Sequence, residues 1–247
     1  MDFFRALNAE VLKLRRTLAL AMVFVCPLLI VALQFMIQFD RLGRPNPGNP
    51  PQWDQLIRNI AGLWVVLMLP LYLTLETALL GALEHSESQW RNLFTLPVAR
   101  SAIYFSKLIV ATVMLAVSHL ALAGGIYLSG KLLALRDPRA YTAGFPLAMA
   151  FSMLGTIFVL ALLIVVLHHA ISLHWHSFTV ATGAGISATV INFIVVNSKY
   201  GIYYPWSLPV QPLSPQGVQG HSLIYSCTGA LIVAALSSWH FSRRDVS

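Results

Sequence analysis

The chain has 247 residues, of which 57% are hydrophobic and only 10% are charged, and its mean hydropathy is +0.71. Ordinary soluble domains carry about 25% charged residues, so this composition excludes a soluble fold. A formal net charge of +7 would suggest nucleic acid as the partner of a soluble protein. Here the basic residues adjoin apolar runs, which places them closer to anionic lipid headgroups than to any nucleic acid. We therefore expect contact with membrane lipids and no nucleic-acid binding.

Six apolar runs follow one another along the chain. Each is close to the ~20 residues that a helix rising about 1.5 Å per residue needs to cross ~30 Å of hydrocarbon. The first run follows Lys13, Arg15 and Arg16, but it is too long for a secretory signal and lacks a small-residue cleavage site. The sequence therefore predicts an all-α integral membrane protein, with one transmembrane domain over residues 1–247 and spans at about 18–39, 60–83, 108–129, 145–167, 177–197 and 222–240.

The basic residues set the expected orientation, because Lys and Arg in short loops stay mostly on the cytoplasmic side. Six spans place both termini on the same side of the membrane. The basic residues divide almost evenly between the two sides, so the cluster of Lys13, Arg15 and Arg16 directly before the first span carries more weight. We expect both termini to be cytoplasmic.

The loops between the spans differ in composition. Residues 40–54 are rich in proline and are expected to form an exposed outer linker. Residues 198–221 mix aromatic residues with prolines, which suits a segment at the membrane interface, and a dip back into the membrane is the alternative. Residues 84–107 instead predict a short amphipathic helix, then Leu96-Pro97, then the start of the third span.

Three segments, one in the loop after the second span and one near each end, carry a resemblance to a known family. They are residues 83–100 (LEHSESQWRNLFTLPVAR), followed by Ile103, Tyr104 and Lys107, residues 10–17 (EVLKLRRT) and residues 241–246 (FSRRDV). With the six-span layout, the chain resembles the type-two ATP-binding cassette (ABC) exporter permeases over essentially its whole length. It is most similar to small bacterial permeases that export, or protect against, peptide antibiotics such as bacitracin and lantibiotics.

The resemblance implies a multi-pass permease of the bacterial inner membrane that is not itself an enzyme. Such permeases work as dimers, with a second copy or a related permease, on two cytoplasmic ATP-binding cassette ATPase subunits. ATP and magnesium are then held by the partner ATPase, and this chain binds no cofactor and no metal. The loop after the second span is a coupling helix in that family, which would assign the ATPase-coupling interface to Glu84, His85, Glu87, Trp90, Arg91 and Leu93.

The spacing of these residues alone supports two interpretations. A helix that presents Glu84, Glu87 and Trp90 fits a groove on a soluble partner, with Trp90 as the buried anchor. Alternatively, Trp90 sits in the interfacial aromatic belt while the carboxylates are solvated. Spacing alone favours the second interpretation, and the resemblance reverses that order.

Few ionisable residues lie within the spans, and the clearest are Glu76 in the second and His119 in the third. Charge in hydrocarbon is costly, so both are candidates for a transport pathway. The plainer alternatives are that Glu76 faces a hydrated cleft or a neighbouring helix, and that a neutral His119 hydrogen-bonds across helices. The shortage of such residues disfavours a proton-driven or sodium-driven carrier.

Two further motifs are assigned no site. Residues 125–132 (GIYLSGKL) match a phosphate-binding loop except at the last position, and they end a span instead of following a strand. Four histidines at the junction of the fourth and fifth spans are candidate metal ligands, but no Cys or carboxylate accompanies them. We expect these histidines to be neutral polar residues of a short cytoplasmic loop. The alternative is a pH-sensitive contact with a partner or a lipid headgroup. The four residues are His168, His169, His174 and His176.

Three functional classes are compatible with this chain. The preferred class is the permease of an ABC exporter, in which substrate crosses between two subunits, chiefly along the second and fifth spans if the resemblance holds. A membrane-embedded enzyme is disfavoured, because the sequence has no His-Glu-x-x-His helix, paired aspartates or Gly-x-Ser-x-Gly elbow. The third class is an ATP-independent carrier. The substrate is left open by the sequence.

Overall fold

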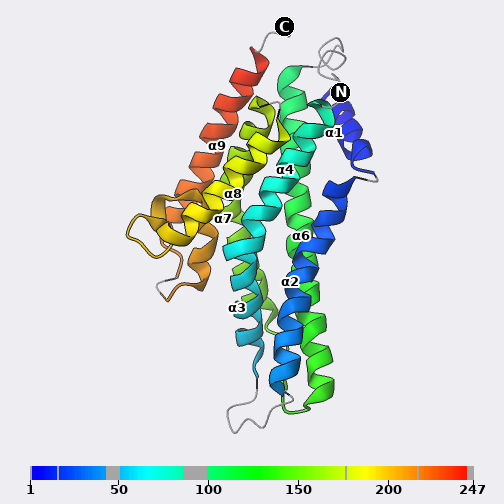
Figure 1. The fold of residues 1–247 in the computed structure, drawn as a ribbon, viewed down its shortest axis with the longest axis vertical. Coiled ribbons are helices and arrows are strands. Elements are labelled where there is room, and N and C mark those ends of the chain that lie inside the picture. Colours follow the sequence, from blue (N-terminus) through cyan, green and yellow to red (C-terminus); the bar gives the residue numbers. More distant parts are fainter. Residues whose placement is uncertain are drawn as a thin grey trace.

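The computed structural model describes residues 2–15, 17–42, 51–85, 99–175, 177–215 and 217–243. In this part of the chain all regular structure is helical, which confirms the predicted fold class. Figure 1 shows an elongated bundle with both ends of the chain at the same end of the molecule. Within the described residues, six helical segments are long and apolar enough to cross a membrane: Leu18–Leu42, Trp53–Ala82, Arg100–Arg136, Leu147–His174, Phe178–Val195 and Gly220–Ser242.

The first two helices are α1 (Asp2–Lys13) and α2 (Leu18–Leu42). α1 is a short helix at the end of the bundle that carries both termini, and it packs against the first turns of α6 (Arg100–Arg136) (Figure 1). α2 lies alongside α6 over most of its length. The two come close at Gly125, where an added Cβ would meet the side chain of Val31 at 2.9 Å.

The second span is built from three consecutive pieces: α3 (Trp53–Leu63), the π-helical turn η1 (Trp64–Met68) and α4 (Leu69–His85). The π-helical turn ends two residues before Pro70, whose ring removes a backbone donor from the helix. Such turns occur mostly as local irregularities within α-helices, frequently at functional sites. Residues 43–50 of the outer linker expected before this span lie outside the described residues.

The third and fourth spans are longer than their apolar cores. α6 begins eight residues before the predicted start at residue 108 and ends seven residues after 129. α7 (Leu147–His174) likewise runs past residue 167. At about 1.5 Å per residue, α6 is roughly 55 Å long, well beyond the ~30 Å hydrocarbon core. The hydropathy of the sequence shows where the apolar run ends, but the helix itself extends beyond that run, to Arg100 at one end and to Arg136 at the other.

Between α8 (Phe178–Val195) and α9 (Gly220–Ser242) the chain forms two 3-10 helices, η2 (Gly201–Tyr203) and η3 (Pro205–Leu213). η3 packs against α7, and its Trp206 ring lies 5.4 Å from that of His168 while Leu208 is fully buried. Ser207 donates a 2.6 Å hydrogen bond to the side-chain oxygen of Asn192 in α8. This segment therefore packs against α7 and α8 through η3, and both the interfacial position and the dip into the membrane stay predictions.

An aromatic cluster closes the opposite end of the bundle from the termini. Trp53 is 3% exposed, and its ring lies 6.3 Å from Tyr127, 5.1 Å from Tyr141 and 5.0 Å from Phe145. Its indole N–H donates a 2.8 Å hydrogen bond to the backbone carbonyl of Ala143. Burial raises the pKa of Tyr141 to about 12. Trp53 thus joins the start of the second span to the segment that follows α6.

α8 approaches α4 and α7 most closely at Gly185. A Cβ added there would overlap the Thr74 side chain and lie 2.5 Å from His168, whereas one added at Gly183 meets nothing within 4 Å. We expect Gly185→Ala to lower the free energy of unfolding by about 1–3 kcal/mol through overpacking. Gly183→Ala, two residues away on the same helix, should be neutral or slightly stabilising. Chemical denaturation of the purified variants in detergent measures both, and equal stabilities would contradict the close packing.

Candidate functional site

The predicted coupling segment leaves and re-enters the bundle at the end where both termini lie. Glu84 and His85 form the last turn of α4, and the chain returns at Arg100, the first residue of α6 (Figure 1). The side chains of Glu84 and His85 are not among the described parts of the structure. Four of the predicted interface residues lie outside the described residues: Glu87, Trp90, Arg91 and Leu93.

The start of α6 is held to α1 by a buried ion pair. The Lys107 ammonium lies 2.6 Å from Oε2 of Glu10, and the two side chains are 2% and 7% exposed. The other Glu10 oxygen, Oε1, accepts a 2.9 Å hydrogen bond from Lys13. Both carboxylate oxygens are therefore paired, as a buried carboxylate requires.

The sequence alone does not show this ion pair, although both residues lie within segments that resemble the permease family. The one feature of the sequence that could have indicated an ion pair is the charged residue Lys107 at the start of the third span. A buried ammonium needs a partner, but the choice of Glu10 depends on how α1 folds back onto α6, which a single sequence does not show.

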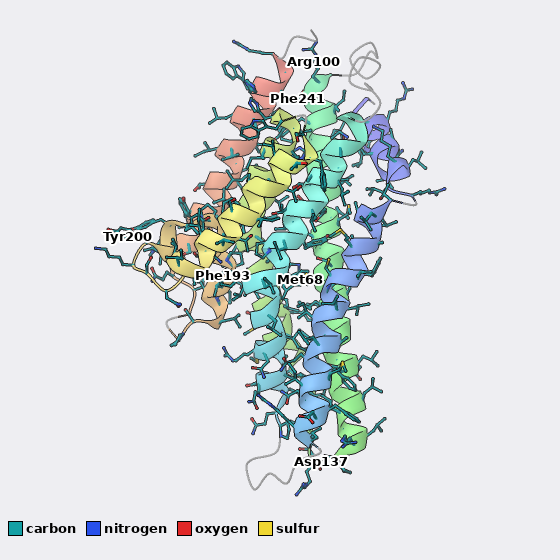
Figure 2. The ribbon with its side chains drawn as sticks, viewed as in Figure 1. Met68, Arg100, Asp137, Phe193, Tyr200 and Phe241 are labelled. Carbon is teal, nitrogen blue, oxygen red and sulfur yellow. The ribbon has the colours of Figure 1, made fainter. Side chains whose placement is uncertain are left out.

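The same turns of α6 are also attached to the end of α9. Arg100 donates a 3.2 Å hydrogen bond to the backbone carbonyl of Ser242, and Figure 2 places Arg100 near Phe241. One helical turn further on, the Tyr104 hydroxyl hydrogen-bonds Ser237 of α9. The Tyr104 ring also packs at 6.1 Å from that of Phe241, which is 4% exposed. The returning end of the predicted coupling segment is thus fixed to both terminal helices.

Glu76 and His119, the candidate pathway residues, lie inside the bundle of this chain. Glu76 is fully buried and His119 is 6% exposed. The Trp64 ring lies 5.8 Å from His119 and 5.9 Å from Tyr72, and Tyr72 precedes Glu76 by one turn of α4. The structure therefore gathers both candidates around Trp64 and Tyr72, between η1, α4 and α6.

This group contains several polar atoms without a protein partner. His119 donates through Nδ1 to the Leu115 carbonyl at 2.9 Å. Among the described residues, no hydrogen-bond partner is found for Nε2 of His119 and Nε1 of Trp64, and the Tyr72 hydroxyl lies next to the Glu76 carboxylate without a well-formed hydrogen bond. Unsatisfied buried polar atoms are the usual sites of internal water. The described hydrogen bond of His119 stays within α6, so its plainer alternative, a hydrogen bond across helices, stays a prediction.

The interpretation of the four histidines as residues of one short loop is wrong. His168 and His169 lie within α7, each 1% exposed, because the helix continues beyond its apolar run to His174. Nε2 of His168 is 3.3 Å from the Thr74 hydroxyl, and the His169 ring packs at 4.8 Å from Tyr104. These two side chains are packing residues between helices. His176 lies outside the described residues.

Comparison with known proteins assigns the family. The sequence model of the family described as ABC-2 family transporter protein matches residues 6–193, about three quarters of the chain. None of the curated proteins compared with the chain matches it. The matched region runs from α1 almost to the end of α8 and includes the predicted coupling segment. Permeases of this family generally work with separate ATP-binding cassette ATPases. With its six candidate spans, the chain belongs to the ABC-2 transporter family as a multi-pass membrane permease.

Proposed function

We propose that this chain is the permease subunit of an ATP-driven exporter in the bacterial inner membrane, with both termini cytoplasmic. The observation that carries the proposal is the family match over α1 to α8, which includes the predicted coupling segment between α4 and α6. That segment leaves the bundle at the same end as the two termini (Figure 1). A cytoplasmic ATPase would therefore meet the coupling segment, α1 and the end of α9 on one surface.

The contacts around α6 suggest how motion of an ATPase reaches the spans. When the ATPase subunits close on ATP, they push the segment 84–95 against α4 and α6. The start of α6 is tied to α1 through Lys107 and Glu10, and to α9 through Arg100. A displacement of the coupling segment is thus shared by four helices. This shared movement would tilt the spans and open the path outward.

The substrate path lies between two permeases in this proposal. α8 leaves much of its apolar surface uncovered in the single chain, including Ile186, Val190 and Phe193, which are all about half exposed. A second copy or a related permease covers this surface, and α4 and α8 then face the path. The buried positions of Glu76 and His119 support a role inside one subunit more than direct contact with substrate. The whole chain, residues 1–247, acts as one permease domain.

The expected cargo is a peptide antibiotic or another amphipathic compound, either exported or removed from the membrane for self-protection. ATP and magnesium stay on the partner ATPase, and the permease itself catalyses no reaction. An ATP-independent carrier and a membrane-embedded enzyme are the alternatives, and both would act without the ATPase.

The coupling prediction is tested by changes in the segment between α4 and α6. The chain is expressed with its genomic neighbours, and the associated ATPase and ATP-driven transport are measured after purification. Trp90→Ala should lower ATP-driven transport tenfold or more and weaken ATPase copurification, because a buried interface anchor contributes about 2 kcal/mol or more. Glu84→Ala and Glu87→Ala should uncouple transport from hydrolysis while the spans stay folded.

Trp175→Ala is the matched control, because Trp175 is 46% exposed near the same end of the bundle and lies outside the coupling segment. It should leave transport unchanged. Full transport in all three coupling variants would overturn the coupling assignment. A chain that purifies without an ATPase and transports or reacts without ATP would support one of the two alternatives.

A further inference from the structure

A mostly apolar groove of about 360 Å³ lies between the last turns of α7 and α9. Its sides include Leu167, Ala170, Ile171 and Leu236, and we call it the terminal groove. Both helices finish at the end of the bundle where the chain termini lie (Figure 1). The apolar runs predicted for the fourth and sixth spans stop at residues 167 and 240, so the groove lies at the margin of the hydrocarbon. Its volume falls within the ~300–1,000 Å³ of sites that hold small ligands.

Two imidazole rings from different helices meet at the mouth of the terminal groove. His174 lies in the last turn of α7 and His240 in the last turn of α9, and the centres of their rings are 5.5 Å apart. Both side chains are exposed, so a ligand in the groove can reach them. Arg243 follows His240 by three residues, and no Asp or Glu is found among the described residues that line the groove. The groove thus combines apolar walls with a basic mouth.

The hydroxyl groups at the floor of the terminal groove are already used within the chain. The Tyr104 hydroxyl lies 2.5 Å from Oγ of Ser237, and Ser237 donates a 2.6 Å hydrogen bond to the Val233 carbonyl. Tyr104 is also fully buried. Recognition of a ligand therefore depends on the apolar walls and on the basic groups at the mouth.

The basic side chains at the mouth are needed before an anion can bind there. The free carbonyls at the ends of α7 and α9 carry partial negative charge and would by themselves repel an anion. α8 has no ionisable residue, and Arg100 and His169 are used by the Ser242 carbonyl and the Tyr104 ring. The charged and titratable side chains that α6, α7 and α9 bring to this end are Arg100, Tyr104, His169, His174, His240 and Arg243. The two imidazoles at the mouth and Arg243 are the ones placed to meet a ligand.

We propose that the terminal groove binds an anionic phospholipid of the leaflet on the side of the termini. One acyl chain lies along Leu167, Ile171 and Leu236, and the phosphate accepts hydrogen bonds from the two imidazoles and from Arg243. The position favours a lipid over a soluble partner, because Leu236 is 62% exposed at the end of an apolar span and the exposed Trp239 suits the membrane interface. Basic pockets between spanning helices on the cytoplasmic side hold such headgroups.

Lipid affinity is measured by native mass spectrometry of the purified chain in detergent, without ATP or ATPase. At pH 6, dioleoyl phosphatidylglycerol should bind about tenfold more tightly than dioleoyl phosphatidylcholine, whose choline cancels the charge of the phosphate. The preference should fall at pH 8, because imidazole loses its positive charge between about pH 5 and 8. The double variant His174→Gln/His240→Gln should remove this pH-dependent part. Arg243→Gln should weaken phosphatidylglycerol at both pH values.

Matched variants separate the terminal groove from the rest of the lipid-facing surface. Ala170→Phe fills the groove and should weaken both lipids about tenfold. Ala235→Phe makes the same change on an exposed side of α9 outside the groove, and His221→Gln replaces an exposed histidine at the other end of α9. Both should bind as the wild type does. Glycerol 3-phosphate, which has the phosphate but no acyl chain, should not displace the lipid.

Modification of the wild-type chain by diethyl pyrocarbonate, mapped by peptide mass spectrometry, shows where the lipid binds. Phosphatidylglycerol should protect His174 and His240 and leave His221 reactive. The inference is overturned if the two lipids bind equally, if the groove variants bind as the wild type does, or if glycerol 3-phosphate displaces the lipid. Protection by the partner ATPase and not by the lipid would also overturn it and assign the groove to that partner.

This inference goes beyond the proposed export function and can fail separately from it. The lipid measurements use the purified chain alone and need neither transport nor ATP. Lipid binding by a chain that recruits no ATPase would leave the terminal groove assigned and remove the exporter. ATP-driven transport by a chain that does not distinguish the two lipids would do the reverse.

Discussion

Replacing Lys107 with Met is expected to lower the free energy of unfolding by about 3 kcal/mol, because the buried Glu10 carboxylate loses its closest cation. Lys13 remains bound to the other oxygen of Glu10, which keeps the loss at the lower end of the range for broken buried pairs. The measurement is denaturant unfolding of the purified chain in mild detergent. In a transport assay, the same variant should lower coupled activity, since α1 is released from α6.

Lys13→Met provides the comparison within the same ion-pair group. Lys13 is 29% exposed, so its pair with Glu10 is screened by solvent and should contribute less than about 1 kcal/mol. Adding Glu10→Gln to Lys107→Met should recover part of the lost stability, because the unpaired buried charge is removed. Equal, small losses for Lys107→Met and Lys13→Met would show that the ion pair between α1 and α6 is not buried as described.

Trp53→Ala should lower the free energy of unfolding by about 3–5 kcal/mol. The substitution empties the centre of the aromatic cluster beside Tyr127, Tyr141 and Phe145, and it removes the hydrogen bond to the Ala143 carbonyl. The cluster joins the start of α3 to the segment after α6, so the loss should be accompanied by faster proteolysis of that segment. Denaturant unfolding and limited proteolysis measure the two effects.

Trp239→Ala is the control for this prediction, because Trp239 is 56% exposed on α9. Its described contact is the Arg243 guanidinium, 4.3 Å from the centre of its ring. An exposed contact of this kind contributes about 1 kcal/mol or less. A loss for Trp53→Ala no larger than that for Trp239→Ala would contradict the central position of Trp53.

Much of the fold could be predicted from the sequence because the bilayer imposes a simple rule on composition. An apolar run of ~20 residues predicts a spanning helix wherever it occurs. The ends of those helices could not be predicted in the same way. Arg100 and Arg136 extend α6 beyond the apolar run, and His168 and His169 extend α7, because helical hydrogen bonding does not stop where hydrophobicity does.

The candidate site could likewise be predicted only in part. The position of the coupling segment came from its resemblance to a family, and the family match includes it. The pairing of Glu10 with Lys107, by contrast, depends on a contact between residues 97 positions apart in the sequence. Residues 198–221 are rich in proline and aromatic side chains, which indicated an interface but not the packing of η3 against α7.

The length of α6 has a mechanical consequence. It is one helix without interruption from Arg100, beside the predicted coupling segment, to Arg136, next to Asp137 at the opposite end of the molecule (Figure 2). A stiff rod of roughly 55 Å that tilts by about 10° around one end moves its other end by about 10 Å. In the proposed exporter, a small push at the end of α6 beside the predicted coupling segment would therefore be transmitted to the opposite end without any intermediate joint, and the loop after α6 would move together with the coupling segment.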